Sequence, residues 1–278
     1  MIRLSANGYI KMRYIDTHAH YWDRRFEEEY GKEGVDQMID TLFQREGLLA
    51  AINVGTSPET SRLALRQAYR HPHMYAAVGI HPSDAQEITD IDKALAEIRT
   101  MLGDSRVVAL GEIGLDYHYE PTDRALQLDV FHKQMAMAEE FDLPVVIHDR
   151  EAHGDCMDVI RAYPRVRGVF HSYSGSAEMA EELLRHGYMI SFSGTVTFKN
   201  AKRVAAVAES LPPDRVFVET DCPYLTPHPY RGKLNHSGYI PYTVAALADL
   251  YGITPDACSR QTAENAVRFF GLTEIQLD

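Results

Sequence analysis

Short apolar runs rich in Val, Ile, Ala and Phe recur along the chain and are separated by longer segments of mixed polarity. Such runs are nearly free of polar residues, which is typical of strands that are covered on both faces. The pattern predicts eight strands, at residues 13–18, 48–54, 74–80, 106–112, 144–148, 167–172, 188–193 and 215–220.

The segments between these runs carry helical signals. Residues 57–70 begin with Ser57 as a predicted N-cap, followed by Pro58 at the first helical position. Residues 125–142 repeat their apolar positions every three to four residues and stop before a proline. Further helices are predicted at 176–187, 241–252 and 255–271. Eight strands that alternate with helices predict a parallel sheet closed into an α/β (β/α)8 TIM barrel, with an open doubly wound sheet as the alternative fold.

Length, apolar runs and cysteine content indicate how the chain is organised and where it is located. A chain of 278 residues suits one barrel domain over residues 13–278, preceded by an N-terminal extension at residues 1–12. No apolar run is long enough to cross a membrane, and the start lacks a signal-peptide pattern. The three cysteines are far apart and form no CxxC pair, so we expect no disulfide framework and a cytoplasmic location.

The net charge of −12 argues against a protein that coats DNA through a large basic surface. It does not exclude an enzyme that handles phosphate groups in a local, metal-rich pocket. Polar residues at the ends of the predicted strands indicate such a pocket. The carboxyl ends of parallel barrel strands meet at one rim, where barrel active sites are built. Six side chains that can bind metal fall at these ends: His18, His20, Glu112, His148, His171 and Asp221.

The spacing of these residues supports a shared site. His18 and His20 are two apart, as strand geometry requires for one face, although such a pair alone is more often an ordinary pair of loop histidines. Glu112 ends an apolar run, and its two oxygens could bridge two cations, the alternative being an ion-paired rim carboxylate. Asp221 is predicted as a ligand and Glu219, which should also face inward, as a supporting residue or buried hydrogen-bonding partner, but the two roles could be exchanged.

A set of imidazole and carboxylate ligands without a thiolate suits two divalent metal ions such as Zn, Mg or Mn. Two cations about 3.5–4 Å apart can polarise a substrate oxygen and lower the pKa of a water molecule. An aspartate at the site can then accept the proton of that water. Asp221 and Glu112 are therefore the catalytic candidates.

Several blocks of sequence resemble, in order, the motifs of the TatD family of metal-dependent deoxyribonucleases. The resemblance spans roughly residues 14–270. The blocks are IDTHAH (15–20), GIHP (79–82), GEIGLDY (111–117), LPVVIHDREA (143–152), FHSYSG (170–175), ISFSGTVTF (190–198) and ETDCPYLTPHPYRG (219–232).

The resemblance implies a (β/α)8 barrel that hydrolyses DNA phosphodiester bonds from the 3′ end. It implies one ion held by His18, His20, Glu112 and Asp221, and a second held by Glu112, His148 and His171. It also implies substrate contacts by His81, Arg150 and Arg231. His81 could instead be a turn residue before Pro82, and Arg150 could simply pair with a neighbouring acid.

Three functional hypotheses follow. The first is a nuclease, a 3′–5′ exonuclease acting on single-stranded or frayed DNA, with RNA as a further substrate. The second is an amidohydrolase or esterase, such as a deacylase, in which the same site attacks a carbonyl carbon. The third is a barrel without enzymatic activity, which the intact set of six candidate ligands disfavours. Trp22, beside the histidine pair, could stack on a base or pack under the rim.

Overall fold

The computed structural model describes residues 12–119 and 121–277. Within these residues one sheet contains eight strands in the order β1 to β8, and each neighbouring pair is parallel. The predicted N-terminal extension, residues 1–12, lies outside the described residues except for its last residue. The strands are β1 (Tyr14–Ala19), β2 (Leu48–Val54), β3 (Met74–Val78), β4 (Val107–Asp116), β5 (Val145–Arg150), β6 (Gly168–Phe170), β7 (Met189–Phe192) and β8 (Val216–Val218).

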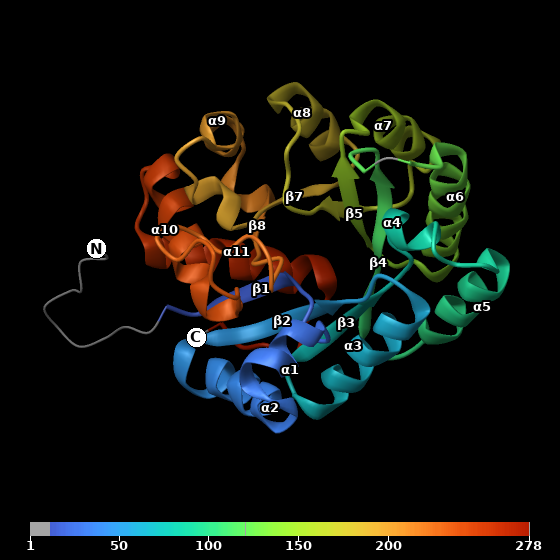
Figure 1. The fold of residues 1–278 in the computed structure, drawn as a ribbon. Coiled ribbons are helices and arrows are strands. Elements are labelled where there is room, and N and C mark those ends of the chain that lie inside the picture. Colours follow the sequence, from blue (N-terminus) through green and yellow to red (C-terminus); the bar gives the residue numbers. More distant parts are fainter. Residues whose placement is uncertain (1–11, 120, 278) are drawn as a thin grey trace, which may run out of the picture.

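The chain segment that follows β8 returns to β1 and nearly closes the sheet into a barrel (Figure 1). The backbone N–H of Asp221 donates to the carbonyl oxygen of His18 over 2.9 Å, and that of His20 donates to the carbonyl oxygen of Cys222 over 2.8 Å. An open doubly wound sheet would leave these edges apart. The predicted (β/α)8 TIM barrel is therefore confirmed, and the alternative fold is wrong.

Helices connect the strands and cover the outside of the barrel (Figure 1). The predicted start of α3 is confirmed, because the Ser57 and Thr60 side chains each accept a hydrogen bond from the other's backbone N–H. Among the described residues none of the helices is both long and apolar enough to cross a bilayer. The helices are α1 (Arg24–Tyr30), α2 (Lys32–Thr41), α3 (Pro58–Arg70), α4 (Pro82–Ala85), α5 (Ile91–Met101), α6 (Arg124–Phe141), α7 (His153–Ala162), α8 (Ala177–Arg185), α9 (Lys202–Ser210), α10 (Ile240–Tyr251) and α11 (Pro255–Phe270). Shorter turns of helix are η1 (Leu42–Glu46), η2 (Gly194–Thr197), η3 (Pro213–Arg215) and η4 (Ser237–Tyr239).

Strand β4 is longer than the sequence predicts, since it continues past Glu112 to Asp116. Gly114 lies within this extension with a φ of +133°, and a Cβ atom there would collide with the backbone oxygen of His148. The glycine therefore lets β4 stay paired with β5 up to the rim. Strands β6 and β8 are shorter than predicted, because the residues after them turn away into the loops of the rim.

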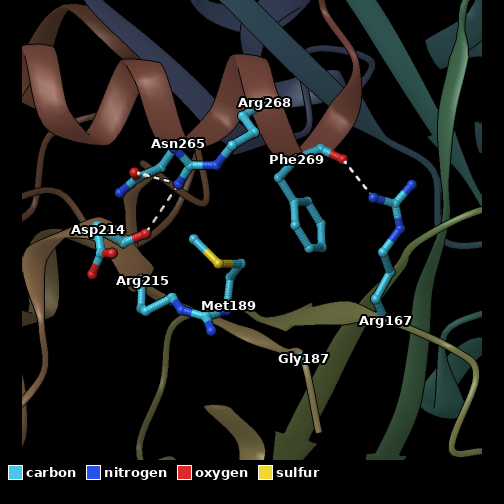
Figure 2. A pocket seen from close by; sticks show the side chains of 8 residues that line it. All are labelled: Arg167, Gly187, Met189, Asp214, Arg215, Asn265, Arg268 and Phe269. Carbon is cyan, nitrogen blue, oxygen red and sulfur yellow. Dashed lines mark hydrogen bonds between the residues drawn. The ribbon is translucent and has the colours of Figure 1, made fainter. Parts of the chain in front are cut away.

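Helix α11 closes the end of the barrel at which the strands begin. The ring centres of its Phe269 and Phe270 lie 5.4 and 5.5 Å from that of Phe217 in β8. These rings belong to a second core cluster, to which the strands contribute every second residue, such as Ala50, Ile52 and Val54 of β2. A pocket of about 430 Å³ opens beside this helix (Figure 2). Its lining residues lie at the starts of β6, β7 and β8 and on α11: Arg167, Gly187, Met189, Asp214, Arg215, Asn265, Arg268 and Phe269.

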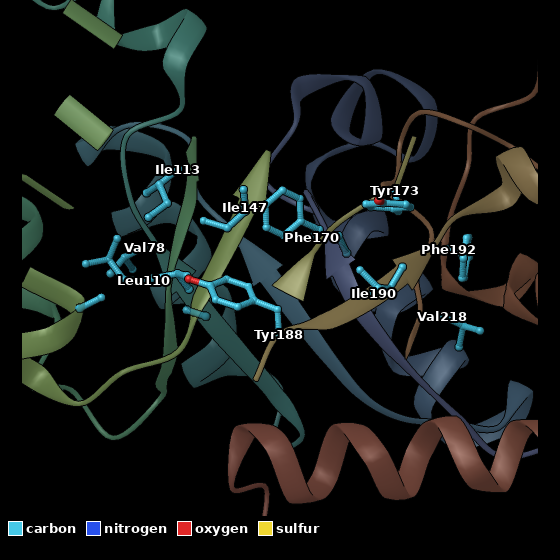
Figure 3. Packing of buried hydrophobic residues seen from close by; sticks show 14 of the residues in the cluster. Val78, Leu110, Ile113, Ile147, Phe170, Tyr173, Tyr188, Ile190, Phe192 and Val218 are labelled. Atoms are coloured by element: carbon cyan, nitrogen blue, oxygen red, sulfur yellow. The ribbon is translucent and has the colours of Figure 1, made fainter. Parts of the chain in front are cut away.

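The larger core cluster fills the layer between the strands and the surrounding helices (Figure 3). Ile147 and Phe170 from the strands, and Phe131 and Ile160 from the helices, are all buried there. Burying a side chain of this size contributes about 1.5–3 kcal/mol. The strand ends that carry the polar residues therefore rest on closely packed walls.

Candidate metal centre

The six side chains predicted as metal ligands lie together at the rim where the strands end. They come from five of the eight strands or from the loops that directly follow these strands. Histidines come from β1 and β5, and from just after β1 and β6, while carboxylates come from β4 and from the loop after β8. The residues are His18 and His20, Glu112, His148, His171 and Asp221.

The carboxylate of Glu112 lies between two groups of histidines. Its Oε1 atom is 2.9 Å from Nδ1 of His148 and 2.9 Å from Nε2 of His171. Its Oε2 atom is 3.3 Å from Nε2 of His18 and 3.7 Å from Nε2 of His20. Each oxygen therefore faces a different pair of imidazoles, which is the arrangement that a bridging carboxylate needs.

Asp221 completes the group around the two histidines of β1. Its Oδ1 atom lies 3.3 Å from Nε2 of His20 and 3.7 Å from Nε2 of His18. The residue has a φ of 56°, a left-handed conformation that aspartate tolerates better than most residues. Glu219 lies on the outer side of His171 instead: its Oε1 is 3.4 Å from Nδ1 of His171 and accepts from the backbone N–H of Ser172 over 2.6 Å. Of the two acids that the sequence left interchangeable, Asp221 is the one beside the β1 histidines.

Hydrogen bonds on the outer side of the cluster fix the proton positions of two histidines. Nδ1 of His20 is 2.7 Å from the carbonyl oxygen of Val54, and Nε2 of His148 is 3.0 Å from Oδ2 of Asp116. A carbonyl or ionised carboxylate oxygen only accepts, so these ring nitrogens carry the protons. When neutral, as in a metal-bound state, each imidazole then turns a lone pair towards Glu112.

The donor atoms of the cluster fit a pair of cations. Nε2 of His18 lies 3.1 Å from Nε2 of His20, and Nδ1 of His148 lies 3.2 Å from Nε2 of His171. Lone pairs that face one another and a carboxylate repel unless positive charge lies among them. His18, His20 and Glu112 form one group of ligand atoms within 4.8 Å of one another, and Glu112, His148 and His171 form a second. Nitrogen and oxygen donors of this kind suit Zn, Mn or Mg.

The electrostatics of the cluster favour a cation as well. Burial opposes protonation of His148, yet the adjacent Asp116 and Glu112 carboxylates raise the pKa of its imidazole. Burial would raise the pKa of Glu112, but His171, His81 and His18 hold it well below the usual range. Glu112 is therefore an anion, and its surroundings attract positive charge.

His81 lies at the edge of the cluster and caps helix α4. Its Nδ1 accepts a hydrogen bond from the backbone N–H of Ser83 over 3.1 Å, so Nε2 carries the proton of the neutral ring. Nε2 is 3.6 Å from Oε1 of Glu112. Burial and the neighbouring His148 lower the pKa of His81 to about 3. His81 is therefore a neutral N–H donor beside the site, and it serves as a turn residue as well.

The two predicted substrate arginines lie farther out. Arg150 at the end of β5 donates to the hydroxyl of Tyr119 over 3.1 Å, and its guanidinium carbon is 4.9 Å from the ring centre of the tyrosine. The guanidinium of Arg231 lies 4.0 Å over the ring of Phe198. Among the described residues neither arginine has a hydrogen bond or ion pair with the six clustered side chains. Substrate contact by either arginine stays a prediction.

Comparison with known proteins agrees with this geometry. Residues 15–271 match the family described as TatD related DNase. The chain belongs to the TatD family. It is 37% identical over 258 residues to "Uncharacterized metal-dependent hydrolase YabD" of Bacillus subtilis, covering 92% of this chain and 98% of that protein. It is 35% identical over 266 residues to "Uncharacterized metal-dependent hydrolase YcfH" of Escherichia coli, covering 95% and 97%.

A solved structure supports the same placement. The crystal structure of YJJV, a TatD homologue from Escherichia coli, superposes with a TM-score of 0.84 at 27% identity. The match covers 94% of this chain and 99% of that one. Together, the family match and the relatives make this chain a metal-dependent hydrolase of the TatD family.

Two acids that support the site of this TatD chain were not predicted from the sequence. Asp116 holds His148, as described above, and it lies four residues after Glu112 on the same strand. Buried Asp16 accepts from the backbone N–H of His18 over 3.3 Å, and from the backbone N–H and hydroxyl of Thr220 over 3.0 and 2.6 Å. Both acids are an even number of residues from a candidate ligand in the same strand, and that spacing could have singled them out.

The pocket beside α11 is at the other end of the barrel and shares no residue with the cluster (Figure 2). A cavity alone does not identify a reaction site. We place the chemistry at the rim, because the metal-binding side chains converge there.

Proposed function

We propose that this protein is a two-metal deoxyribonuclease that removes nucleotides from the 3′ end of single-stranded or frayed DNA. The position of Glu112, with one oxygen towards each group of histidines, carries the proposal, because phosphodiester hydrolysis commonly uses two adjacent cations. The description of the matched family as TatD related DNase supports the choice of phosphodiester substrates.

In this proposal each group of ligands holds one ion. His18, His20, Glu112 and Asp221 would hold the first, and Glu112, His148 and His171 the second. When bound, the ions would polarise the scissile phosphate and lower the pKa of a water molecule at the site.

The residues of the chain supply the remaining chemistry. Burial works against ionisation of Asp221, but the neighbouring His20 and His171 lower its pKa, so it is ionised and able to accept the proton of the attacking water. The Nε2–H of His81 donates to a non-bridging phosphate oxygen, which orients the scissile group. Glu112 stays ionised throughout and keeps the two groups of histidines at a fixed separation.

An assay on labelled single-stranded DNA tests the proposal. With added Mg²⁺ or Mn²⁺ we expect stepwise shortening from the 3′ end, and a 5′ label retained on the shortened strands. Glu112→Gln and His148→Ala should lose both this activity and metal, as measured by elemental analysis. Glu59→Gln, the same kind of change at an exposed position of α3, is the matched control.

Absence of released nucleotides from DNA with either metal would refute the proposal. A parallel panel of ester, lactone and amide substrates identifies the carbonyl-hydrolase alternative, since its turnover by a protein inactive on DNA would favour that reaction. Turnover that is unchanged in Glu112→Gln would show that the cluster is not the reaction site.

A further inference from the structure

We propose that Trp22, Arg25 and Tyr224 form an aromatic platform that stacks a nucleobase of the substrate beside the metal cluster. This inference rests on the proposed function and deepens it, since it assigns a site for the base. The ring centres of Trp22 and Tyr224 lie 5.5 and 6.4 Å from that of His20, at interplanar angles of 73° and 79°. Two aromatic side chains from distant parts of the chain thus flank one ligand of the cluster.

Tyr224 offers the exposed aromatic surface. Its side chain is among the few large hydrophobic ones at the surface, with 46% exposed. Its backbone is held firmly, since its N–H donates to the carbonyl oxygen of Asp221 over 2.9 Å and its carbonyl accepts from Nδ2 of Asn235 over 2.5 Å. The ring therefore has a fixed position relative to Asp221, and the exposure of an ordered aromatic ring there indicates a surface for binding.

Arg25 extends this surface with a second flat group. Its guanidinium carbon lies 4.0 Å from the centre of the Tyr224 ring. Asp23 holds the guanidinium through two hydrogen bonds, of 2.9 Å to Nε and 2.6 Å to Nη2. This pairing compensates the charge of Arg25, and the Asp23 carboxylate repels phosphate. The stack therefore suits an uncharged aromatic ring, and single-stranded nucleic acids present their bases to such stacks.

Trp22 is fixed by the same contact that orients His20. Its indole N–H donates to the carbonyl oxygen of Val54 over 2.7 Å, and that oxygen also accepts from Nδ1 of His20. The indole is half-buried, so it packs at the rim and still keeps part of its ring accessible. Trp22 is the single tryptophan of the chain, and its fluorescence reports on this position alone.

Kinetics on paired substrates test the platform. One single-stranded oligonucleotide ends in ordinary 3′ nucleotides, and the other carries abasic residues at these positions. Stacking of one base contributes about 1–3 kcal/mol, so Tyr224→Leu should lower kcat/KM on the ordinary strand by about 5- to 150-fold. The same substitution should leave kcat/KM on the abasic strand unchanged. Tyr224→Phe, which keeps the ring, should retain the wild-type preference for bases.

Tyr69→Leu is the matched control, because Tyr69 is also exposed but lies on α3, where its hydroxyl donates to Asp104. This substitution should leave kcat/KM unchanged on both the ordinary and the abasic strand. Fluorescence gives a measurement that does not depend on turnover. In the Asp221→Asn protein with Mg²⁺, the ordinary strand should quench Trp22, the abasic strand should not, and an added Tyr224→Leu change should weaken the binding.

The outcomes separate this inference from the proposed function. If DNA is cleaved but Tyr224→Leu lowers kcat/KM equally on both strands, or on neither strand, the platform is refuted and the nuclease stands. If no DNA is cleaved but only the base-bearing strand quenches Trp22, the platform stands and the nuclease is refuted. Equal quenching by both strands overturns the platform.

Discussion

The hydrogen bond between Asp116 and His148 leads to the sharpest prediction about the metal centre. Oδ2 of Asp116 is 3.0 Å from Nε2 of His148, and the carboxylate is only 3% exposed. Because an ionised carboxylate only accepts, it keeps the proton on Nε2 and the lone pair on Nδ1, which faces Glu112. Asp116→Asn preserves the size of the side chain but can turn an N–H donor towards the imidazole.

A donor at this position would move the imidazole proton to Nδ1, where it would point at the site of the proposed second ion. Loss of a partner of this kind costs about 10- to 100-fold in metal affinity or activity, which corresponds to about 1.4–2.7 kcal/mol. We expect Asp116→Asn to weaken metal binding by that factor and to lower kcat/KM for DNA in parallel. The fold should persist, because Oδ1 also accepts from the backbone N–H of His118 and an amide oxygen can replace it.

Metal titration by isothermal calorimetry, with the circular dichroism spectrum recorded for each protein, measures this effect. Asp158→Asn is the control, since it makes the same chemical change at an exposed residue whose partner is Arg161. Wild-type metal affinity in a folded Asp116→Asn protein would refute the argument that the outer carboxylate selects the proton position of His148. If Asp158→Asn weakened metal binding as well, the effect would not be specific to the position of Asp116.

Four further changes give distinct results. Asp16→Ala removes the acceptor of two buried hydroxyls and two backbone N–H groups, so the free energy of unfolding in urea should fall by about 3 kcal/mol or more, and a change under 1 kcal/mol would contradict this. Burial lowers the pKa of His236 to about 4 from 6.5, so the unfolded chain takes up this proton first as pH falls. The free energy of unfolding should therefore fall by up to about 3 kcal/mol between about pH 6.5 and 4. His236→Asn should reduce this fall. Removal of metal by chelation should lower the melting temperature, since a ligand at about 100 times its Kd stabilises by about 2.7 kcal/mol; an unchanged melting temperature would count against bound metal. Arg215→Ala at the pocket beside α11 should leave DNA cleavage unchanged, and a large loss would place part of the reaction there.

The eight strands and the convergence of six polar side chains could be predicted because both follow from local pattern and one rule of topology. Apolar runs mark the strands, and parallel strands end at a common rim. His148 and His171 are far apart in sequence, yet each needed only its position at the end of a strand to be assigned there. The extra length of β4 could not be predicted in this way, because Gly114 depends on a backbone from β5 that approaches closely.

The outer contacts of the site were less accessible to sequence reasoning. Asp16 bonds to Thr220 and Ser237, more than two hundred residues later in the chain, and no local pattern encodes such a contact. Arg150 and Arg231 are on loops or at loop junctions, where strand periodicity does not set the direction of a side chain. The structure shows them against Tyr119 and Phe198, so aromatic neighbours determine where they point.

The acidic charge of the chain is compatible with the proposed DNA substrate once the charge of the site is considered. Glu112 and Asp221 carry a formal charge of −2, and two divalent ions would add +4, which leaves the centre at about +2. With Arg25 compensated by Asp23, phosphate attraction is concentrated at the metals and the base binds by stacking. Such a protein neutralises few phosphates, so its KM should depend on salt far more weakly than the binding of a protein that contacts six to ten phosphates.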